Sequence, residues 1–316
     1  MRSFRRLSIP LLAIMLVSIL LSVWLMGCAA KKVAESPELE KYLGPKKRIA
    51  VLDFEVKAVG APRDAARGLS DMFITALHST GRFVVVERAE MDAMLQEQEL
   101  GELGVLRPGT TSKIGDILGA QLLVKGSITQ FHEKMGSTGV GRFKVETVSG
   151  NVAMDIRTFD TSTGVIIGSH AAVGESTKRN LGGTAVIKGV AVTRGEFEKT
   201  ALGEASRQCI DRAVRAVVKE MQAIPWQRSI ASVEADQIYI SKAGRNSGIK
   251  VGDVMEIWKR GEELTDPNTG ESLGYKSSEI GLCTVCQIAE KFSIADITEG
   301  AGVSRGDFVK LAAKEE

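Results

Sequence analysis

The sequence has little of what most binding and catalytic chemistries require. Aromatic residues make up 5% of its 316 residues, three residues are histidine, and the formal net charge is +2. A chain this close to neutrality has no general basic surface for nucleic acid, and few rings are available to stack on bases or sugars. We therefore exclude nucleic acid as a partner.

Motifs of catalysis and cofactor binding are also absent. The chain has no Gly-Lys-Ser/Thr phosphate loop and no Gly-x-Ser-x-Gly nucleophile elbow. His78, His132 and His170 have no second histidine or cysteine at the spacing of metal ligands. We expect no catalytic residue, no cofactor and no metal, so the chain is not predicted to be an enzyme.

One cysteine pair, Cys283-Thr-Val-Cys286, has the spacing of redox motifs. A redox or zinc site of this kind needs a helix start or a second such pair, whereas these cysteines lie in a strand-like run. Residues three apart on a regular strand point to opposite faces, which favours core packing or a bulge. An exported redox enzyme is the alternative, because disulfides are permitted outside the cytosol.

The N-terminus has the anatomy of a bacterial export signal. Residues 1–6 are basic, residues 7–26 are mostly apolar, and Leu25-Met26-Gly27-Cys28 resembles the lipobox of bacterial lipoproteins. This resemblance implies a signal peptide over residues 1–27, a lipidated Cys28 with palmitate among its acyl chains, and anchorage at the periplasmic face of the outer membrane. An uncleaved anchor is the alternative, since about 20 apolar residues span a bilayer. Residues 28–47 are polar and are predicted to be a tether.

Hydrophobic periodicity predicts an α+β domain over residues 48–224. A helix is predicted after Pro62, because Leu69, Phe73 and Leu77 recur on one helical stripe. Further helices are predicted over residues 90–100, 111–119 and 197–222, and strands over residues 48–54, 83–87, 121–131, 151–159 and 165–167. This order indicates a mixed sheet packed by helices, with β-hairpin insertions.

From residue 229 the pattern changes to short strands separated by glycine and turn residues. Residues 247–254 and 301–308 resemble each other, and each stretch places Gly-Asp before an apolar strand. Asp266-Pro-Asn-Thr-Gly270 is typical of a hairpin turn. We predict a small all-β barrel-like domain over residues 229–316.

Several blocks of the first domain resemble the curli-secretion channel family (CsgG/HfaB). They are Arg48-Ile-Ala-Val-Leu-Asp-Phe54, Gly68-Leu-Ser-Asp-Met72, Gly81-Arg-Phe-Val-Val-Val-Glu-Arg88 and Gly119-Ala-Gln-Leu-Leu-Val-Lys-Gly-Ser-Ile128. The second domain is similar, less specifically, to the C-terminal barrel of the flagellar assembly protein T. The family resemblance implies an outer-membrane lipoprotein that assembles as a homo-oligomeric ring. Each subunit would lend two β-hairpins to a transmembrane wall, through which exported fibre subunits pass.

Residues 127–151 and 171–194 have room for these membrane hairpins, because a barrel strand needs about 9–11 residues. The predicted membrane-hairpin residues are Phe131, Met135, Phe143, Val145 and Ile187. Glu133 interrupts the first apolar face, and Glu175 lies in the second hairpin. A charge at the midplane of a barrel wall costs about 2–4 kcal/mol, so hairpins that stay in the periplasm are the alternative.

The sequence therefore supports two functions. The first is secretion or assembly of an extracellular or envelope structure through a ring-shaped oligomer, with exported fibre subunits and periplasmic accessory proteins as expected partners. The second is a non-channel periplasmic adaptor lipoprotein that docks on an envelope machine. In the family that this chain resembles, a loop after the first strand carries aromatic and amide residues that narrow the pore. The loop at that place in this chain, residues 57–63, has no aromatic or amide residue, so no constriction residue is assigned.

Overall fold

The computed structural model describes most of the chain beyond the predicted tether. The described residues are 42, 44–62, 64–86, 119–140, 143–161, 165–180, 197, 199–222, 224–268 and 272–312. Within them the α+β class is confirmed, because a mixed sheet with two helices is followed by a closed barrel. The predicted helix over residues 90–100, and the predicted helix over residues 111–119 up to its last residue, lie outside the described residues.

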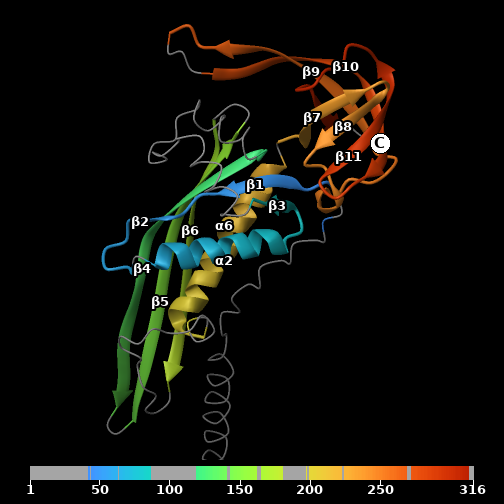
Figure 1. Cartoon of the computed structure of the whole chain (residues 1–316). Coiled ribbons are helices and arrows are strands. Elements are labelled where there is room, and N and C mark those ends of the chain that lie inside the picture. The colour runs from blue at the N-terminus through green and yellow to red at the C-terminus, as the bar shows by residue number, and fades with distance from the viewer. Residues whose placement is uncertain are drawn as a thin grey trace, which may run out of the picture. The chain divides into compact units, whose positions relative to one another are not determined.

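The first part of the described chain is a six-stranded sheet with two helices (Figure 1). Its elements are β1 (Lys47–Val51), β2 (Glu55–Val56), α2 (Ala65–Ser79), β3 (Phe83–Val85), β4 (Leu122–Val140), β5 (Phe143–Asp160), β6 (Ile166–Asn180) and α6 (Ala201–Met221). The strands follow the order β3-β1-β4-β5-β6, and β2 pairs with β4. Parallel pairing of β1 with β3 and β4, and antiparallel pairing of β4, β5 and β6, make the sheet mixed.

Helix α2 confirms the predicted helical stripe. Leu69, Phe73 and Leu77 are buried, and the Phe73 ring lies 5.4 Å from the Phe54 ring, centroid to centroid. The helix ends before Gly81, whose φ of 69° is the left-handed conformation that glycine adopts without strain. Because α2 contacts β2, β3 and α6, it closes the core over the parallel side of the sheet.

Helix α6 begins at Ala201, later than the predicted residue 197, because Thr200 caps it. The Thr200 hydroxyl accepts a hydrogen bond of 2.9 Å from the Gly203 N–H, which satisfies one of the free donors of the first turn. A line of residues on the helix is buried: Cys209, Ala213, Val217 and Met221. The helix packs on β4, β5 and β6, where Val152, Met154 and Ile156 of β5 are buried as their alternation predicts.

The predicted hairpin arms are continuations of sheet strands, not separate insertions into loops. Strand β4 runs without a break from Leu122 to Val140, and β6 includes both the predicted short strand and the first arm of the second predicted hairpin. The described part of the second hairpin ends at Asn180. The β4–β5 pairing therefore connects the buried sheet to its exposed end, with one register shift between Ile128 and Gln130.

The second part of the described chain is a closed barrel with strand order β10-β11-β8-β7-β12-β9. Its elements are β7 (Gln227–Glu234), β8 (Gln237–Ser241), the 3-10 turn η1 (Arg245–Ser247), β9 (Val254–Thr265), β10 (Ser272–Ile288), β11 (Phe292–Gly300) and β12 (Phe308–Leu311). Isoleucines 230, 238, 240 and 257 lie in its core with Met255 and Val309. The two resembling stretches form equivalent turns, since Gly252 and Gly306 both have positive φ, 92° and 96°.

Candidate functional site

The exposed end of the β4–β5 pair is the part of the molecule that the sequence singles out. We call residues 130–153 the outer hairpin. Most residues of β4 between Leu122 and Ile128 are buried, whereas residues 132–137 are all exposed, although they alternate between the two faces of the strand. Figure 1 shows β4 and β5 extending well past α2. In the subunit by itself, residues 132–137 contribute little to the core.

Strands β4, β5 and β6 form a three-stranded ribbon. Beyond residue 128 of β4, and along the outer side of β6, the edges of this ribbon have no strand partner in the described chain. Strand β4 pairs with β1 at residues 122–124 and with β2 at residues 127–128, and beyond them its described partner is β5. Strand β6 lies at the end of the sheet and pairs with β5. Unpaired backbone N–H and C=O groups are a template for pairing with another chain. The described subunit therefore offers two strand edges to a neighbour.

The register divides the predicted membrane-hairpin positions between the two faces of the outer hairpin. Phe131 pairs with Val152 and Met135 with Val148, whereas Phe143 pairs with Val140. Because strand positions alternate between faces, the positions of Phe131 and Met135 share one face, and those of Phe143 and Val145 belong to the other. Sequence alternation within each arm could not reveal this, since it depends on which residues pair.

The individual predicted residues have different surroundings. Phe131 is half-buried, and Met135 is 56% exposed. Phe143 and Val145 lie in β5. Cys28 and Ile187 lie outside the described residues, so their assignment remains a prediction.

Close contact with α6 fixes the inner part of the ribbon. A Cβ added at Gly174 would lie 1.8 Å from the Ala205 carbonyl oxygen, and one at Gly150 would lie 2.6 Å from the backbone of Ala201. These distances leave no room for a side chain. The two glycines thus let the first turns of α6 lie directly on β5 and β6, which sequence alone did not predict.

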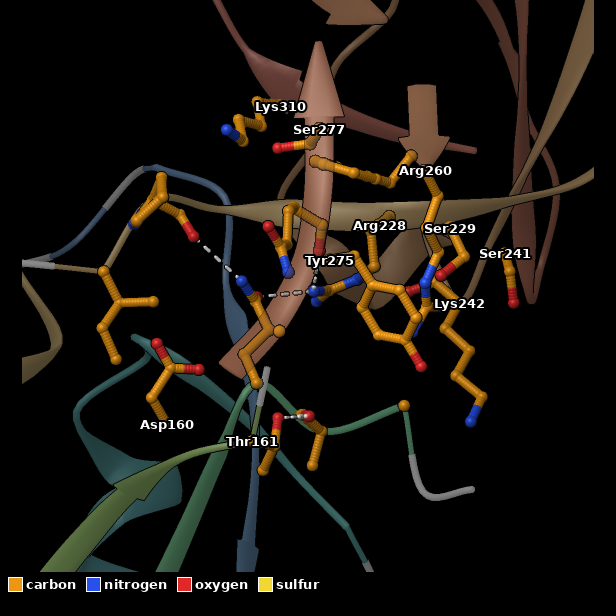
Figure 2. Close-up of a pocket in the computed structure, with 18 of the residues that line it drawn as sticks. Asp160, Thr161, Arg228, Ser229, Ser241, Lys242, Arg260, Tyr275, Ser277 and Lys310 are labelled. Atoms are coloured by element: carbon orange, nitrogen blue, oxygen red, sulfur yellow. Dashed lines mark hydrogen bonds between the residues drawn. The ribbon is translucent and has the colours of Figure 1, made fainter. Parts of the chain in front are cut away.

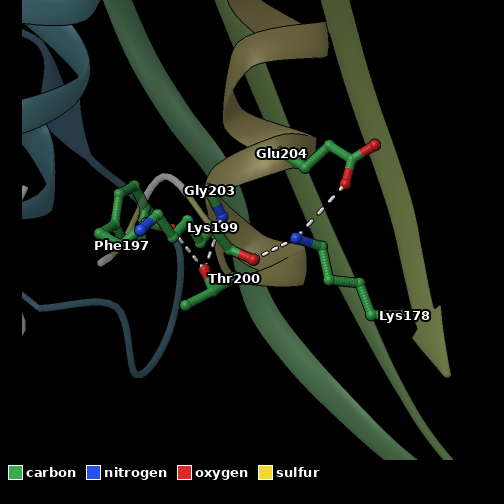
Figure 3. Close-up of polar contacts among 6 residues, drawn as sticks. All are labelled: Lys178, Phe197, Lys199, Thr200, Gly203 and Glu204. Atoms are coloured by element: carbon green, nitrogen blue, oxygen red, sulfur yellow. Dashed lines mark hydrogen bonds and ion pairs between the residues drawn. The ribbon is translucent and has the colours of Figure 1, made fainter. Parts of the chain in front are cut away.

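Polar contacts hold the start of α6 to β6 (Figure 3). The Lys178 ammonium donates a hydrogen bond to the Lys199 carbonyl and lies 3.7 Å from a Glu204 carboxylate oxygen. At the other end of α6, His170 of β6 contacts the Glu220 carboxylate. Both pairs join residues distant in sequence, so only the packing of α6 on β6 reveals them.

The two cysteines of the Cys-x-x-Cys motif point to opposite sides of the barrel wall. Cys283 is fully buried in the barrel core, and Cys286 is exposed. Both are free thiols, and burial raises the pKa of the Cys283 thiol to about 12. A buried, protonated thiol is a poor nucleophile. This geometry confirms the prediction of core packing for Cys283 and contradicts a redox pair.

Neither a metal-binding cluster nor a membrane-spanning helix is found in the part of the chain that the structure describes. No group of three or more histidine, cysteine, aspartate or glutamate side chains there could hold a metal ion. None of the described helices is both long enough and apolar enough to cross a bilayer.

Comparison with known proteins gives one match at the level of a family. The family model described as "Curli production assembly/transport component CsgG" matches residues 31–246 of this chain. A search of curated protein sequences finds no match.

Several solved structures are similar to part of this chain. The C-terminal domain of LpoB from Salmonella enterica is 17% identical, and the match covers 41% of this chain and 83% of that one, with a TM-score of 0.30. Lipoprotein GNA1162 from Neisseria meningitidis is 13% identical over 56% of this chain and 99% of that one, with a TM-score of 0.31. The PelC dodecamer from Paraburkholderia phytofirmans is 14% identical over 58% of this chain and 90% of that one, with a TM-score of 0.30. Likeness at this level carries no argument about function.

Proposed function

Because this chain belongs to the family of the curli production assembly/transport component CsgG, we propose that it is an outer-membrane lipoprotein that acts in secretion or assembly of an extracellular or envelope structure. It works as a ring of identical subunits. Lipid on Cys28 anchors each subunit, and the tether of residues 28–47 connects the anchor to the sheet. Exported fibre subunits pass through the ring, and periplasmic accessory proteins bind beside it.

The observation that carries this proposal is the pair of unpaired edges on the β4–β5–β6 ribbon. Strand β4 beyond residue 128 and the outer side of β6 have no strand partner in the described chain. If the β4 edge of one subunit pairs with the β6 side of the next, the contact is head-to-tail, and such a contact closes into a ring when its rotation allows. Pairing also removes the exposed edges that favour uncontrolled aggregation.

Charge limits how much of the outer hairpin lies in lipid. Glu133 and Lys134 are exposed neighbours in β4, so each face of the strand carries one of them. A charge costs about 2–4 kcal/mol at the midplane and about 0–1 kcal/mol near the interface. These two residues therefore belong at the membrane interface. Deeper in the wall, Lys144 and Glu146 share one face of β5, and that face would line the aqueous interior of the barrel.

The same distribution of charge favours a second candidate, a non-channel periplasmic adaptor. Residues 136–140 are the last part of β4, beyond the charges of Glu133 and Lys134, and at about 3.4 Å per residue they extend roughly 17 Å. The apolar band of an outer-membrane barrel is about 25 Å tall, so this uncharged part of the strand is too short to cross it. In this case the outer hairpin and the ribbon edges bind an envelope machine through backbone pairing, and no passage forms.

Membrane extraction and conductance separate the two candidates. Full-length protein is extracted in mild detergent and sized, then inserted in planar bilayers. A matched variant replaces residues 134–149 by Asn-Gly, which closes the hairpin between the paired residues Glu133 and Gly150. The channel predicts an oligomer with conductance that this variant loses while its sheet still unfolds cooperatively. A monomer without conductance, and a Cys28→Ala form that is fully released from membranes as a monomer, would support the adaptor.

A further inference from the structure

Strands β9 and β10 continue beyond the barrel as a two-stranded arm, which we define as residues 259–280. Strand β12 pairs with β9 as far as Trp258, and β11 pairs with β10 from Gly281 onward. Between these points, β9 and β10 pair only with each other in the described chain. Figure 1 shows the arm reaching well past the barrel. The arm therefore has two strand edges that the described barrel does not use, and such edges are templates for pairing.

One face of the arm is turned toward its own subunit. Four cationic side chains line a cavity of about 430 Å³ to which both the first sheet and the barrel contribute: Arg228, Lys242, Arg260 and Lys310 (Figure 2). Tyr275 of the arm also lines this cavity, and the Arg260 guanidinium lies 3.8 Å from the centroid of its ring. Leu264 belongs to the other face of the arm, because its neighbour Glu263 pairs with Tyr275 and strand positions alternate. Leu264 therefore points away from the cavity, and it is 48% exposed.

The part of the arm beyond Arg260 is acidic. Its exposed carboxylates are those of Glu262, Glu263 and Glu279, and the one exposed cation among its described side chains is Lys276. None of these four side chains forms an ion pair within the described chain. Like charges would repel if two arms paired, and charged edges prevent such pairing in natural sheets. The arm is therefore suited to a basic surface and not to a second arm.

The opposite end of the barrel is basic and partly apolar. We call its exposed residues the basic end: Arg245, Lys250, Val251, Val254 and Lys291. The two valines are 62% and 44% exposed, and Glu290 is the one exposed carboxylate in residues 244–254 and 289–292. The Arg245 N–H donates to the Ala289 carbonyl at 3.1 Å, and the Gly252 N–H donates to the Val285 carbonyl at 2.8 Å. These bonds hold both turns of the basic end against the last residues of β10.

The arm and the basic end are complementary, but they cannot meet within one subunit. The arm carries three exposed carboxylates and one exposed ammonium, whereas the basic end has three exposed cations and one neighbouring carboxylate. Each surface also exposes aliphatic side chains, Leu264 on the arm and Val251 and Val254 at the basic end. Strand β9 begins at Val254, and the path from there to Leu264 spans roughly 34 Å at about 3.4 Å per residue. A contact between the two surfaces therefore needs two copies of this chain.

We propose that the arm of one subunit docks on the basic end of a second copy of this chain. Leu264 packs against Val251 and Val254, and the carboxylates of the arm lie beside the cations of the basic end. This contact rests on the ring of identical subunits proposed above and adds a barrel-to-barrel interface to it. Because the two surfaces differ, the contact is head-to-tail, and it closes into a ring when its rotation allows. Opposite charges set the orientation of the copies.

Disulfide trapping in native membranes tests the contact. Full-length protein carries Leu264→Cys and Val251→Cys together with Cys286→Ser, which removes the exposed thiol of the described chain, and a mild oxidant is added. We expect a ladder of covalent multimers, because each subunit then presents both halves of the contact. Each single cysteine variant should stay unlinked. The matched control, Leu264→Cys with Val59→Cys, should also stay unlinked, since Val59 is fully exposed but lies in the first domain.

Charge exchange tests the electrostatic part of the contact. Glu262→Lys with Glu263→Lys, and separately Lys250→Glu with Lys291→Glu, should each raise the Kd of self-association by about tenfold, because like charges then meet. All four changes together restore opposite charges and should return the Kd to near its wild-type value. Analytical ultracentrifugation of the full-length protein in density-matched detergent measures these Kd values. Damage to the fold would not be rescued in this way.

Three results would overturn the proposal: no ladder in the double cysteine variant, linked dimers from Leu264→Cys alone, and no rescue by the combined charge changes. An oligomer that persists in mild detergent without a ladder would overturn the arm contact and leave the proposed ring intact. A monomer without a ladder would overturn both. A ladder in protein that shows no conductance would support the arm contact and count against the channel.

Discussion

The Lys47 ammonium donates a hydrogen bond to the Met221 backbone carbonyl, so the first strand of the sheet closes the last turn of α6. The same ammonium donates to the Ile224 carbonyl, and Lys47 is 5% exposed. Carbonyls at a helix C-terminus lack donor partners within the helix, and the helix dipole favours a cation there. One buried lysine thus joins two elements from opposite ends of the first domain.

Replacing Lys47 by methionine keeps the apolar stem and removes the donor. We expect Lys47→Met to lower the free energy of unfolding by about 1–3 kcal/mol, because buried carbonyls lose their partner. Urea unfolding at neutral pH measures this change. An unchanged midpoint would show that these carbonyls are satisfied in another way.

The pH dependence of stability should also change in Lys47→Met. Burial lowers the pKa of Lys47 from 10.5 to about 8 in the folded state. Between these two values the unfolded chain binds more protons than the folded one, so this group makes the wild type more stable as pH rises. Burial also raises the pKa of the Cys283 thiol, from 9.0 to about 12, which makes stability fall above pH 9.0. The difference between wild type and Lys47→Met isolates the lysine, and it should grow with pH above 8.

Gly174 is expected to reject any side chain. Gly174→Ala would push a methyl group against the Ala205 carbonyl, 1.8 Å away, and we expect a loss of about 1–3 kcal/mol or more. Gly68→Ala is the matched control, because no atom lies within 4 Å of the added Cβ at that helical position. The control should stabilise the protein by about 0.5–1 kcal/mol. Thermal unfolding of both variants would contradict the close contact if their midpoints shifted in the same direction.

The two equivalent barrel turns should differ in how much they stabilise the fold. Asp307 is 3% exposed, and its carboxylate accepts from the Ser304 N–H at 2.8 Å and the Arg260 N–H at 3.0 Å. Asp253 accepts at 2.8 Å from the Lys250 N–H and is half-buried. We expect about 2–4 kcal/mol of destabilisation from Asp307→Ala and about 1 kcal/mol from Asp253→Ala, measured by urea unfolding. Equal losses would mean that the second acceptor contact contributes nothing.

Thiol labelling should distinguish Cys286 from Cys283. Maleimide should modify Cys286 in the native protein and Cys283 only after unfolding, because one thiol is exposed and the other buried. Peptide mass spectrometry assigns each modification. Labelling of Cys286 should accelerate as pH rises, because the thiolate is the reactive form. Partial desolvation and the neighbouring Asp296 raise the pKa of this thiol, so the acceleration should come at a higher pH than for a free cysteine. Modification of both cysteines at the same rate in native protein would contradict the barrel structure.

Local sequence pattern was sufficient for much of the fold. Helical spacing around Leu69 and Phe73 predicted α2, because an apolar stripe with helical periodicity marks the face of the helix that packs on the core. Repeated Gly-Asp turns predicted a small barrel, and the strands there do close. The register of the outer hairpin was not predictable, since alternation within each arm leaves open which residues pair.

The sequence by itself determined the element types and the absence of familiar catalytic motifs, because periodicity and motif spacing are local properties. Only the tertiary structure decided that Phe131 and Phe143 occupy opposite faces, that Cys283 and Cys286 lie on opposite sides of one wall, and that four cations from distant segments share a cavity. Each of these depends on pairing or packing between segments far apart in the chain, and no local pattern encodes such contacts.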